Sequence, residues 1–292
     1  MAGRMTLRHL EIFAAVCDAG GVSAAARELG VSQPSVSQAV RDLEGHFGVA
    51  LLDRSGRRAR LTEQGRELRV RARDVLGSLD ELERAMGEGG ASTLRLASSI
   101  TCATCHVPAI LASLAETAPE VRVTVRVEDS RAVERDVVSG AADVGLIEGL
   151  VHDGSLAATP FARDRLVCVA SPGRAGERLT VERLVGERLL LRERGSGVRE
   201  LLEAALTERR LSCEPVWESV STEALLAAVE AGIGLSVLPD ALVKRAVGEG
   251  RVVRADVVDL SLTRELLVIR RRGRPMTAGM TAFLDALGVA SA

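Results

Sequence analysis

The chain has 292 residues, enough for a small module together with a larger domain that is itself divided into two lobes. Its composition is 47% hydrophobic but only 2% aromatic, with no Tyr, so any core must be aliphatic. A net charge of -2 excludes a generally cationic protein, so nucleic-acid binding would depend on where the charges lie.

Residues 21–44 predict two short helices around a glycine turn. Three successive alanines favour a first helix with little bulk, and Gly30 permits the turn that follows it. Ser32 suits an N-cap and Pro34 suits a first helical turn, so the second helix should begin near Gln33. Helical spacing then points four apolar side chains inward, namely Val36, Val40, Leu43 and Phe47.

The polar side chains of this second helix are left to face outward. In a helix-turn-helix protein such groups read base edges and hold phosphates. The candidate DNA-binding residues on this helix are Ser32, Gln33, Pro34, Ser35, Ser37, Gln38 and Arg41. A solvated helix in an ordinary bundle is the alternative interpretation of this segment.

Eight arginines and two glutamates fall within residues 54–73, which gives this stretch a net charge of +6. Its position directly after the helix-turn-helix suits phosphate contacts and arginine insertion into a minor groove. We therefore add Arg54, Arg57 and Arg58 to the DNA-binding candidates. A solvated charged face is the alternative.

Residues 62–87 predict a long helix with an apolar seam. Spacings of four and three residues alternate along Leu68, Ala72, Val75, Leu79, Leu82 and Met86. Such a heptad seam predicts pairing with the same helix of a second copy, which would place two recognition helices on one face of DNA. Packing against the chain's own second domain is the alternative. A glycine-rich stretch then ends the helix, and we expect a hinge at 88–92.

These segments resemble the LysR-type transcriptional regulators. The resemblance is carried by Leu7, Leu10 and Phe13, by Ala25-Ala26, by Val31 through Ser37, by Leu43-Glu44 and Phe47-Gly48-Val49, and by Leu51 through Arg54 with Leu61 through Gly65. Leu52 stands where the family usually has Phe, a conservative change. The resemblance implies an α/β protein with a winged helix-turn-helix over 1–61, a linker helix over 62–87 and a two-lobed effector domain of periplasmic-binding-protein type over 93–292.

From residue 93 onward, short apolar runs alternate with helical patterns, which predicts parallel sheets covered by helices. The resemblance places lobe I at about 93–162 and 266–292, lobe II at 163–265, and a small-molecule effector between them. It also implies double-stranded DNA and a second copy of the chain as partners, as a dimer or a dimer of dimers, with RNA polymerase as a further candidate.

Polar clusters follow several of the predicted strands, where ligands of α/β proteins bind. The candidate effector-binding residues are Ser98, Ser99, Thr101, Cys102, Glu148, Ser196, Gly197, Arg199, Ser221 and Thr222. For each cluster alone, simple helix capping is the alternative, and Arg199 has Glu203 as an alternative partner. Two of these segments look like the family branch that senses small anions and carboxylates, although Val198 stands where that branch commonly has Thr.

Cys102 and Cys105 with His106 spell the attachment pattern of c-type haem. The chain shows no signal peptide and no obvious axial ligand nearby, so we expect no haem and no other cofactor. A redox- or metal-responsive regulator that senses through these two cysteines remains an alternative to effector binding.

Two further classes of protein do not fit the sequence. The chain contains no P-loop, nucleophile elbow, His-Glu-x-x-His pair or Rossmann fingerprint, so we do not expect an enzyme. A free-standing solute-binding protein would need export and would have no use for residues 1–86. No run of about 20 apolar residues occurs, so we expect a cytoplasmic protein, without membrane contact, whose five cysteines are reduced.

Overall fold

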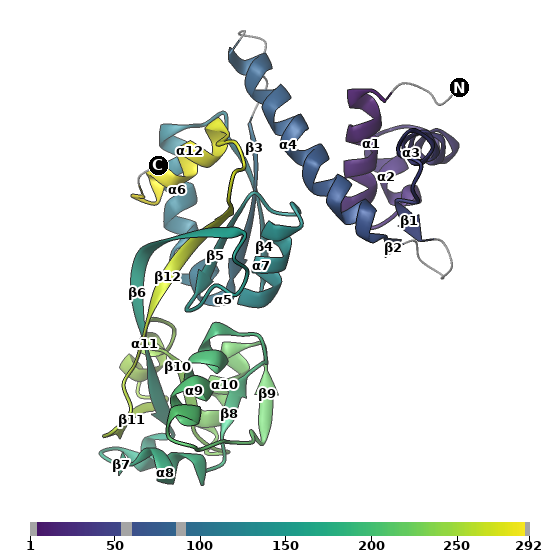
Figure 1. Ribbon diagram of the computed structural model, residues 1–292. Coiled ribbons are helices and arrows are strands. Elements are labelled where there is room, and N and C mark those ends of the chain that lie inside the picture. Colours follow the sequence, from purple (N-terminus) through teal and green to yellow (C-terminus); the bar gives the residue numbers. More distant parts are fainter. Residues whose placement is uncertain (1–4, 54–59, 86–91, 290–292) are drawn as a thin grey trace.

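The computed structural model describes residues 5–53, 60–85 and 92–289 (Figure 1). A helical N-terminal domain is joined by one long helix to two α/β lobes stacked one below the other. The candidates Arg54, Arg57 and Arg58, the seam residue Met86 and the hinge residues 88–91 lie outside the described residues.

The N-terminal domain contains the predicted helix-turn-helix. Its elements are α1 (Leu7–Asp18), α2 (Val22–Glu28), α3 (Gln33–Phe47), and the two short antiparallel strands β1 (Leu52–Asp53) and β2 (Arg60–Leu61). The start of α3 is as predicted, since the hydroxyl of Ser32 accepts a hydrogen bond from the N–H of Ser35 at 3.3 Å. Gly30 takes a positive φ of 65° at the turn, a conformation that glycine adopts without strain.

Three of the four apolar side chains predicted to point inward from α3 do so. Val36, Val40 and Leu43 are fully buried against α1 and α2. The prediction for Phe47 is wrong, because its side chain is 43% exposed. Phe47 is the last residue of α3, where the three-helix core has ended, and its ring instead lines an apolar groove beside the linker helix.

The linker helix α4 spans Glu63–Ala85. The residues of its predicted seam do not share one environment. Ala72 is buried in the core of the N-terminal domain, whereas Val75 and Leu82 are exposed. No helix among the described residues is long and apolar enough to cross a membrane.

The upper lobe in Figure 1, lobe I, is a sheet flanked by helices. Its elements are β3 (Thr93–Ser99), α5 (Ile100–Cys105), α6 (Val107–Thr117), β4 (Arg122–Glu128), α7 (Ser130–Val138), β5 (Val144–Glu148) and the C-terminal α12 (Ala278–Ala286). Strand β3 pairs with β4 and β5 in parallel, as predicted. Aliphatic residues of these strands pack against α6 and α12 to form its main core.

The lower lobe, lobe II, repeats this construction with shorter strands. Its elements are a 3₁₀ turn (Pro172–Arg174), β7 (Arg178–Leu179), α8 (Val181–Val185), β8 (Leu190–Arg192), α9 (Gly197–Glu208), β9 (Trp217–Ser219), α10 (Thr222–Glu230), β10 (Ser236–Pro239), α11 (Asp240–Gly248) and β11 (Val253–Val257). Its cores are aliphatic, in keeping with the composition.

Two long strands, β6 (Leu156–Ala170) and β12 (Leu262–Arg271), run through both lobes (Figure 1). They pair with each other antiparallel, with a register shift between Leu266 and Leu267. β12 is antiparallel to β5, and β10 and β11 are antiparallel to β6. The prediction of parallel sheets therefore holds for β3, β4 and β5 but is wrong for the two long strands, which connect the lobes and must run out of one lobe and back into it.

Candidate effector site and DNA-binding surface

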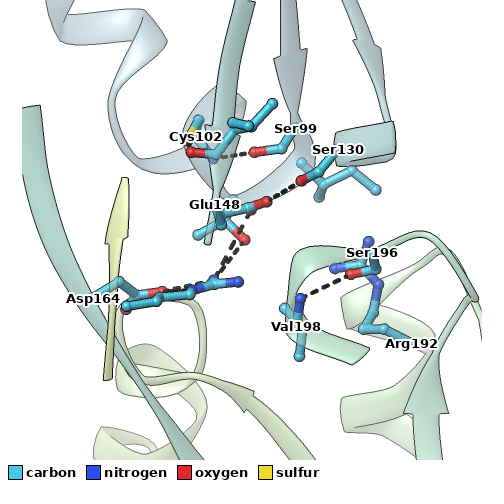
Figure 2. A network of polar contacts seen from close by, with 12 residues as sticks. Ser99, Cys102, Ser130, Glu148, Asp164, Arg192, Ser196 and Val198 are labelled. Carbon is cyan, nitrogen blue, oxygen red and sulfur yellow. Dashed lines mark hydrogen bonds and ion pairs between the residues drawn. The ribbon is translucent and has the colours of Figure 1, made fainter. Parts of the chain in front are cut away.

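Hydroxyl groups and a guanidinium converge on a carboxylate between the lobes. Glu148 ends β5, and its Oε2 accepts a hydrogen bond of 2.6 Å from Ser130, the first residue of α7. Figure 2 shows Ser99 and Ser130 on the lobe I side of Glu148, with Ser196 and Val198 on the lobe II side. The anion-binding position predicted from the sequence thus contains a carboxylate of the protein itself.

The protonation state of Glu148 follows from these neighbours. Burial by itself would raise the pKa of its carboxyl, since Glu148 is only 3% exposed. The charge of Arg264 and the hydroxyls of Ser130, Thr101 and Ser99 outweigh burial and hold the pKa below its usual value. Glu148 is therefore ionised at neutral pH, so these groups already stabilise one negative charge.

Arg264 is the cation of the site. It lies on β12, its side chain is 1% exposed, and its Nη2 donates to Asp164 Oδ2 at 2.7 Å. The same nitrogen lies 3.9 Å from Glu148 Oε1 and 3.4 Å from the hydroxyl of Thr101. Its Nη1 is buried with no hydrogen-bond partner among the described residues, so one donor remains for a ligand.

Lobe II closes directly over Glu148. A Cβ added at Gly197 would lie 2.7 Å from the carbonyl oxygen of Glu148 and 3.2 Å from its Oε2, so only glycine fits there. Gly197 is the first residue of α9, capped by Ser196, so the positive end of this helix meets the carboxylate. Arg131 of lobe I also pairs with Glu200 of lobe II at 2.5 Å. The two lobes are therefore held together around this charge.

Four further candidates lie away from Glu148. Arg199 is buried within lobe II and donates to Glu203 at 2.6 Å, the alternative partner expected from the sequence. Ser221 is exposed and caps α10, while the hydroxyl of Thr222 lies 3.4 Å from Nη1 of Arg192. Ser98 lies buried on the lobe I side and donates to the carbonyl of Ser99. None of these side chains has a described contact with Glu148.

The two cysteines of the redox alternative are poor nucleophiles in this structure. Burial, together with the charge of Glu148, raises the pKa of the Cys102 thiol well above its ordinary value. Burial and the charge of Asp164 also raise the pKa of Cys105. Because the thiolate is the reactive form, this geometry does not favour oxidation sensing.

Arg264, Asp164 and Ser130 were not among the residues predicted from the sequence. A signal for Arg264 existed: along β12, buried and exposed residues alternate from Leu262 to Leu266, and Arg264 stands at a buried position. A cationic side chain that points from a strand into the protein interior requires a buried partner. The partners could not be read from the sequence, because Asp164 precedes Arg264 by 100 residues.

The N-terminal part of α3 presents an exposed polar surface. Gln33, Ser35, Gln38 and Arg41 are exposed, and Ser37 is half-buried. Arg41 donates to Gln38 Oε1 through Nη2 at 2.7 Å, and Gln38 donates to Asp42 at 2.8 Å. These contacts join neighbours on one helix, so they can be exchanged for contacts with bases or phosphates.

An apolar groove of about 430 Å³ lies beside this domain. It runs between α1, the end of α3 and α4, and its lining includes Met5, Phe47, Val49, Leu68 and Val75. Large apolar side chains rarely gather on an exposed surface without a partner.

A DNA-binding helix-turn-helix domain joined to a two-lobed ligand-binding domain is the architecture of a ligand-responsive regulator. Residues 7–66 match the family described as bacterial regulatory helix-turn-helix protein, lysR family, and residues 87–290 match the LysR substrate binding domain. The chain belongs to the LysR family of transcriptional regulators and carries its effector-binding domain.

Individual relatives agree with this assignment. The chain is similar to the HTH-type transcriptional regulator YeiE of Escherichia coli, with 33% identity over 283 residues that cover 96% of each chain. Its fold matches a full-length OxyR variant from Pseudomonas aeruginosa with a TM-score of 0.78, at 21% identity over 99% of this chain and 96% of that one. It also matches CbnR complexed with its target DNA, with a TM-score of 0.61, at 22% identity over 97% of this chain and 99% of that one.

Proposed function

We propose that this LysR regulator binds operator DNA through α3 and the adjoining wing, and responds to a small anion that takes the place of the Glu148 carboxylate between the lobes. The observation that carries the proposal is the set of donors around Glu148: Ser130, Thr101 and Ser99 with Arg264. Donors that hold a carboxylate ionised in a buried position suit another anion of similar size.

Exchange of the carboxylate for a ligand would alter how the lobes meet. Gly197 lies so close to Glu148 that the glutamate side chain cannot move toward α9 without opening the lobes. The unpartnered Nη1 of Arg264 supplies a donor that Glu148 does not use. An anion bound here would therefore change the contacts of both lobes, and through β6 and β12 their relative orientation.

The DNA-binding assignment rests on exposure and hydrogen-bonding capacity. Gln33 and Arg41 are the α3 side chains best suited to bidentate contacts with bases. Arg54, Arg57 and Arg58, outside the described residues, remain proposed phosphate contacts on the strength of the sequence alone.

A second copy of the chain is the proposed occupant of the apolar groove. Val75 in the groove and Leu82 two turns further along α4 are both exposed on the same helix, at the heptad positions of the predicted seam. Pairing of two such helices would cover this surface and set the distance between two copies of α3. Regulation then requires that the anion bind the two DNA-bound arrangements with unequal affinity, since equal affinity shifts no population.

The test combines calorimetry with a mobility-shift assay on the DNA upstream of the gene. A panel of carboxylates, phosphates and sulfur oxyanions should contain a binder whose affinity falls at least ten-fold in Thr101→Val and in Ser130→Ala. These variants should still bind DNA but no longer respond to the anion. Ser221→Ala, at an exposed helix cap away from Glu148, is the matched control and should behave like the unchanged protein. If the anion's affinity is the same in all variants, the site is wrong.

A further inference from the structure

The linker helix α4 packs closely against lobe I. A Cβ added at Gly140, in the turn after α7, would lie 3.6 Å from the Cα of Val70. One added at Gly77 on α4 would lie 3.7 Å from the methyl of Thr277, just before α12. This joint connects the helix that carries the DNA-binding domain to the lobe that contains Glu148.

Charged side chains line the joint, and each aspartate there is shared by two arginines. Asp18 pairs with Arg69, at 3.3 Å, and with Arg73. Both arginines project from α4, whereas Asp18 ends α1.

The pattern continues into lobe I. Asp143 pairs with Arg95 at 2.5 Å and with Arg274 at 2.6 Å. Asp74 of α4 pairs with Arg271 and lies 3.9 Å from Arg274. Together with the pairs of Asp18, these residues bring five guanidinium groups against three carboxylates, a local net charge of +2.

Each of these guanidinium groups has a carboxylate partner, but three of them also carry a buried nitrogen that donates to no described acceptor. The Nε atoms of Arg69, Arg73 and Arg271 are buried and have no hydrogen-bond partner among the described residues. Burial and the nearby charge of Arg95 lower the pKa of Arg73 to about 10, as expected where cations are crowded out of water. Buried donors of this kind normally face a water molecule or an ion.

A cavity of about 110 Å³ lies in the joint, between α4 and lobe I. Its polar lining includes Arg73, Arg95, Arg274 and Asp143, together with the hydroxyl residues Ser92 and Thr277. Three guanidinium groups against one carboxylate make this lining cationic, and the volume suffices for several water molecules or one tetrahedral ion.

We propose that this cavity is a second anion site, which binds an oxyanion of phosphate or sulfate size and fastens α4 to lobe I. Bidentate guanidinium groups and hydroxyls are the donors that such ions prefer in proteins. Because the lining comes from both α4 and lobe I, an ion bound here stabilises this arrangement of the DNA-binding arm over any arrangement in which the two separate.

Calorimetry of the full chain with inorganic phosphate, at an ionic strength kept constant with chloride, tests the proposal. We expect saturable binding that sulfate competes for, and an affinity at least ten-fold lower in Arg73→Gln and in Arg274→Gln. Arg272→Gln is the matched control, because Arg272 is exposed and does not line the cavity. Its phosphate affinity should be unchanged.

Hydrogen exchange gives a second measurement, whose first result comes from the unchanged protein. Phosphate should slow exchange in α4 and in residues 271–277 of the unchanged protein, and should have no such effect in Arg73→Gln. Absence of saturable binding, or equal binding by Arg73→Gln, would overturn the proposal. So would loss of phosphate binding in Thr101→Val but not in Arg73→Gln, since the ion would then lie between the lobes.

Discussion

The recognition helix and the inter-lobe site use the same kinds of side chain in opposite surroundings. On α3, Gln38 and Arg41 are exposed, and among the described residues they bond to near neighbours on their own helix. Between the lobes, Ser130, Glu148 and Arg264 are each at least nine-tenths buried and come from three different elements. The side chains of the first surface can accept a partner without rearrangement, whereas the proposed exchange of anions at the second requires that Glu148 first leave its donors.

This difference in burial predicts which substitutions reduce the free energy of unfolding most. Arg264→Met would leave Glu148 and Asp164 buried without their cation, and should reduce the free energy of unfolding by about 3–5 kcal/mol. Arg163→Met on the neighbouring strand is the matched control, because its side chain is 86% exposed, and should change it by less than about 0.5 kcal/mol. Urea unfolding measures the free energy of unfolding of both variants. An equal decrease in the two would contradict a role for burial.

The apolar groove offers a test of assembly that spares both polar sites. Val75→Glu places a charge on a side chain that is 46% exposed in a single chain, so the chain should fold normally while the helix pairing is disrupted. Operator affinity should fall at least ten-fold because two recognition helices no longer bind as a unit. Light scattering and a mobility-shift titration check this. An unchanged molar mass and affinity would exclude α4 as the dimer contact.

The exposed helix should tolerate substitution but lose specificity. Gln33→Ala and Arg41→Ala should leave stability nearly unchanged, and each should reduce discrimination between operator and random DNA by about 1–3 kcal/mol because a bidentate pair of hydrogen bonds to a base is removed. Arg122→Ala, an exposed position in the effector domain, is the control for general charge. Equal weakening on operator and random DNA would show that these residues bind phosphates only.

Of these two regions, only the inter-lobe site holds a carboxylate whose pKa is lowered, so acid sensitivity should arise there rather than on α3. The pKa of Glu148 lies below its usual value, so the unfolded chain binds more protons and this carboxylate stabilises the fold above its unfolded pKa of about 4.3. That stability is lost as the pH falls through the lower folded pKa. Glu148→Gln should therefore flatten the decline of unfolding free energy below about pH 5, and Gln38→Ala should not. Identical pH profiles would contradict the assignment of an ionised Glu148.

The difference between α3 and the inter-lobe site also explains which features could be predicted from the sequence. The cap at Ser32, the turn at Gly30 and the inward face of α3 depend on spacings of a few residues, and they were confirmed. Phe47 was misplaced because its surroundings are set by α4, which begins 16 residues later.

The inter-lobe site could be predicted only in part. Glu148, Ser99 and Thr101 were candidates because each lies at the end of a recognisable strand or just beyond it. Arg264 was missed because its contact with Thr101 joins residues 163 positions apart, which no local pattern encodes. The closure of Gly197 on Glu148 likewise depends on how two separately folded lobes meet.

The affinity of an anion for Glu148→Gln, compared with the unchanged protein and with Thr101→Val, shows whether the anion and the Glu148 carboxylate occupy the same position. If an anion takes the place of the Glu148 carboxylate, removal of that charge should raise the anion's affinity at least ten-fold, and removal of the Thr101 hydroxyl should lower it. Calorimetry with the best binder from the panel of carboxylates, phosphates and sulfur oxyanions gives both values. An affinity that falls or stays the same in Glu148→Gln would contradict the exchange of one anion for the other.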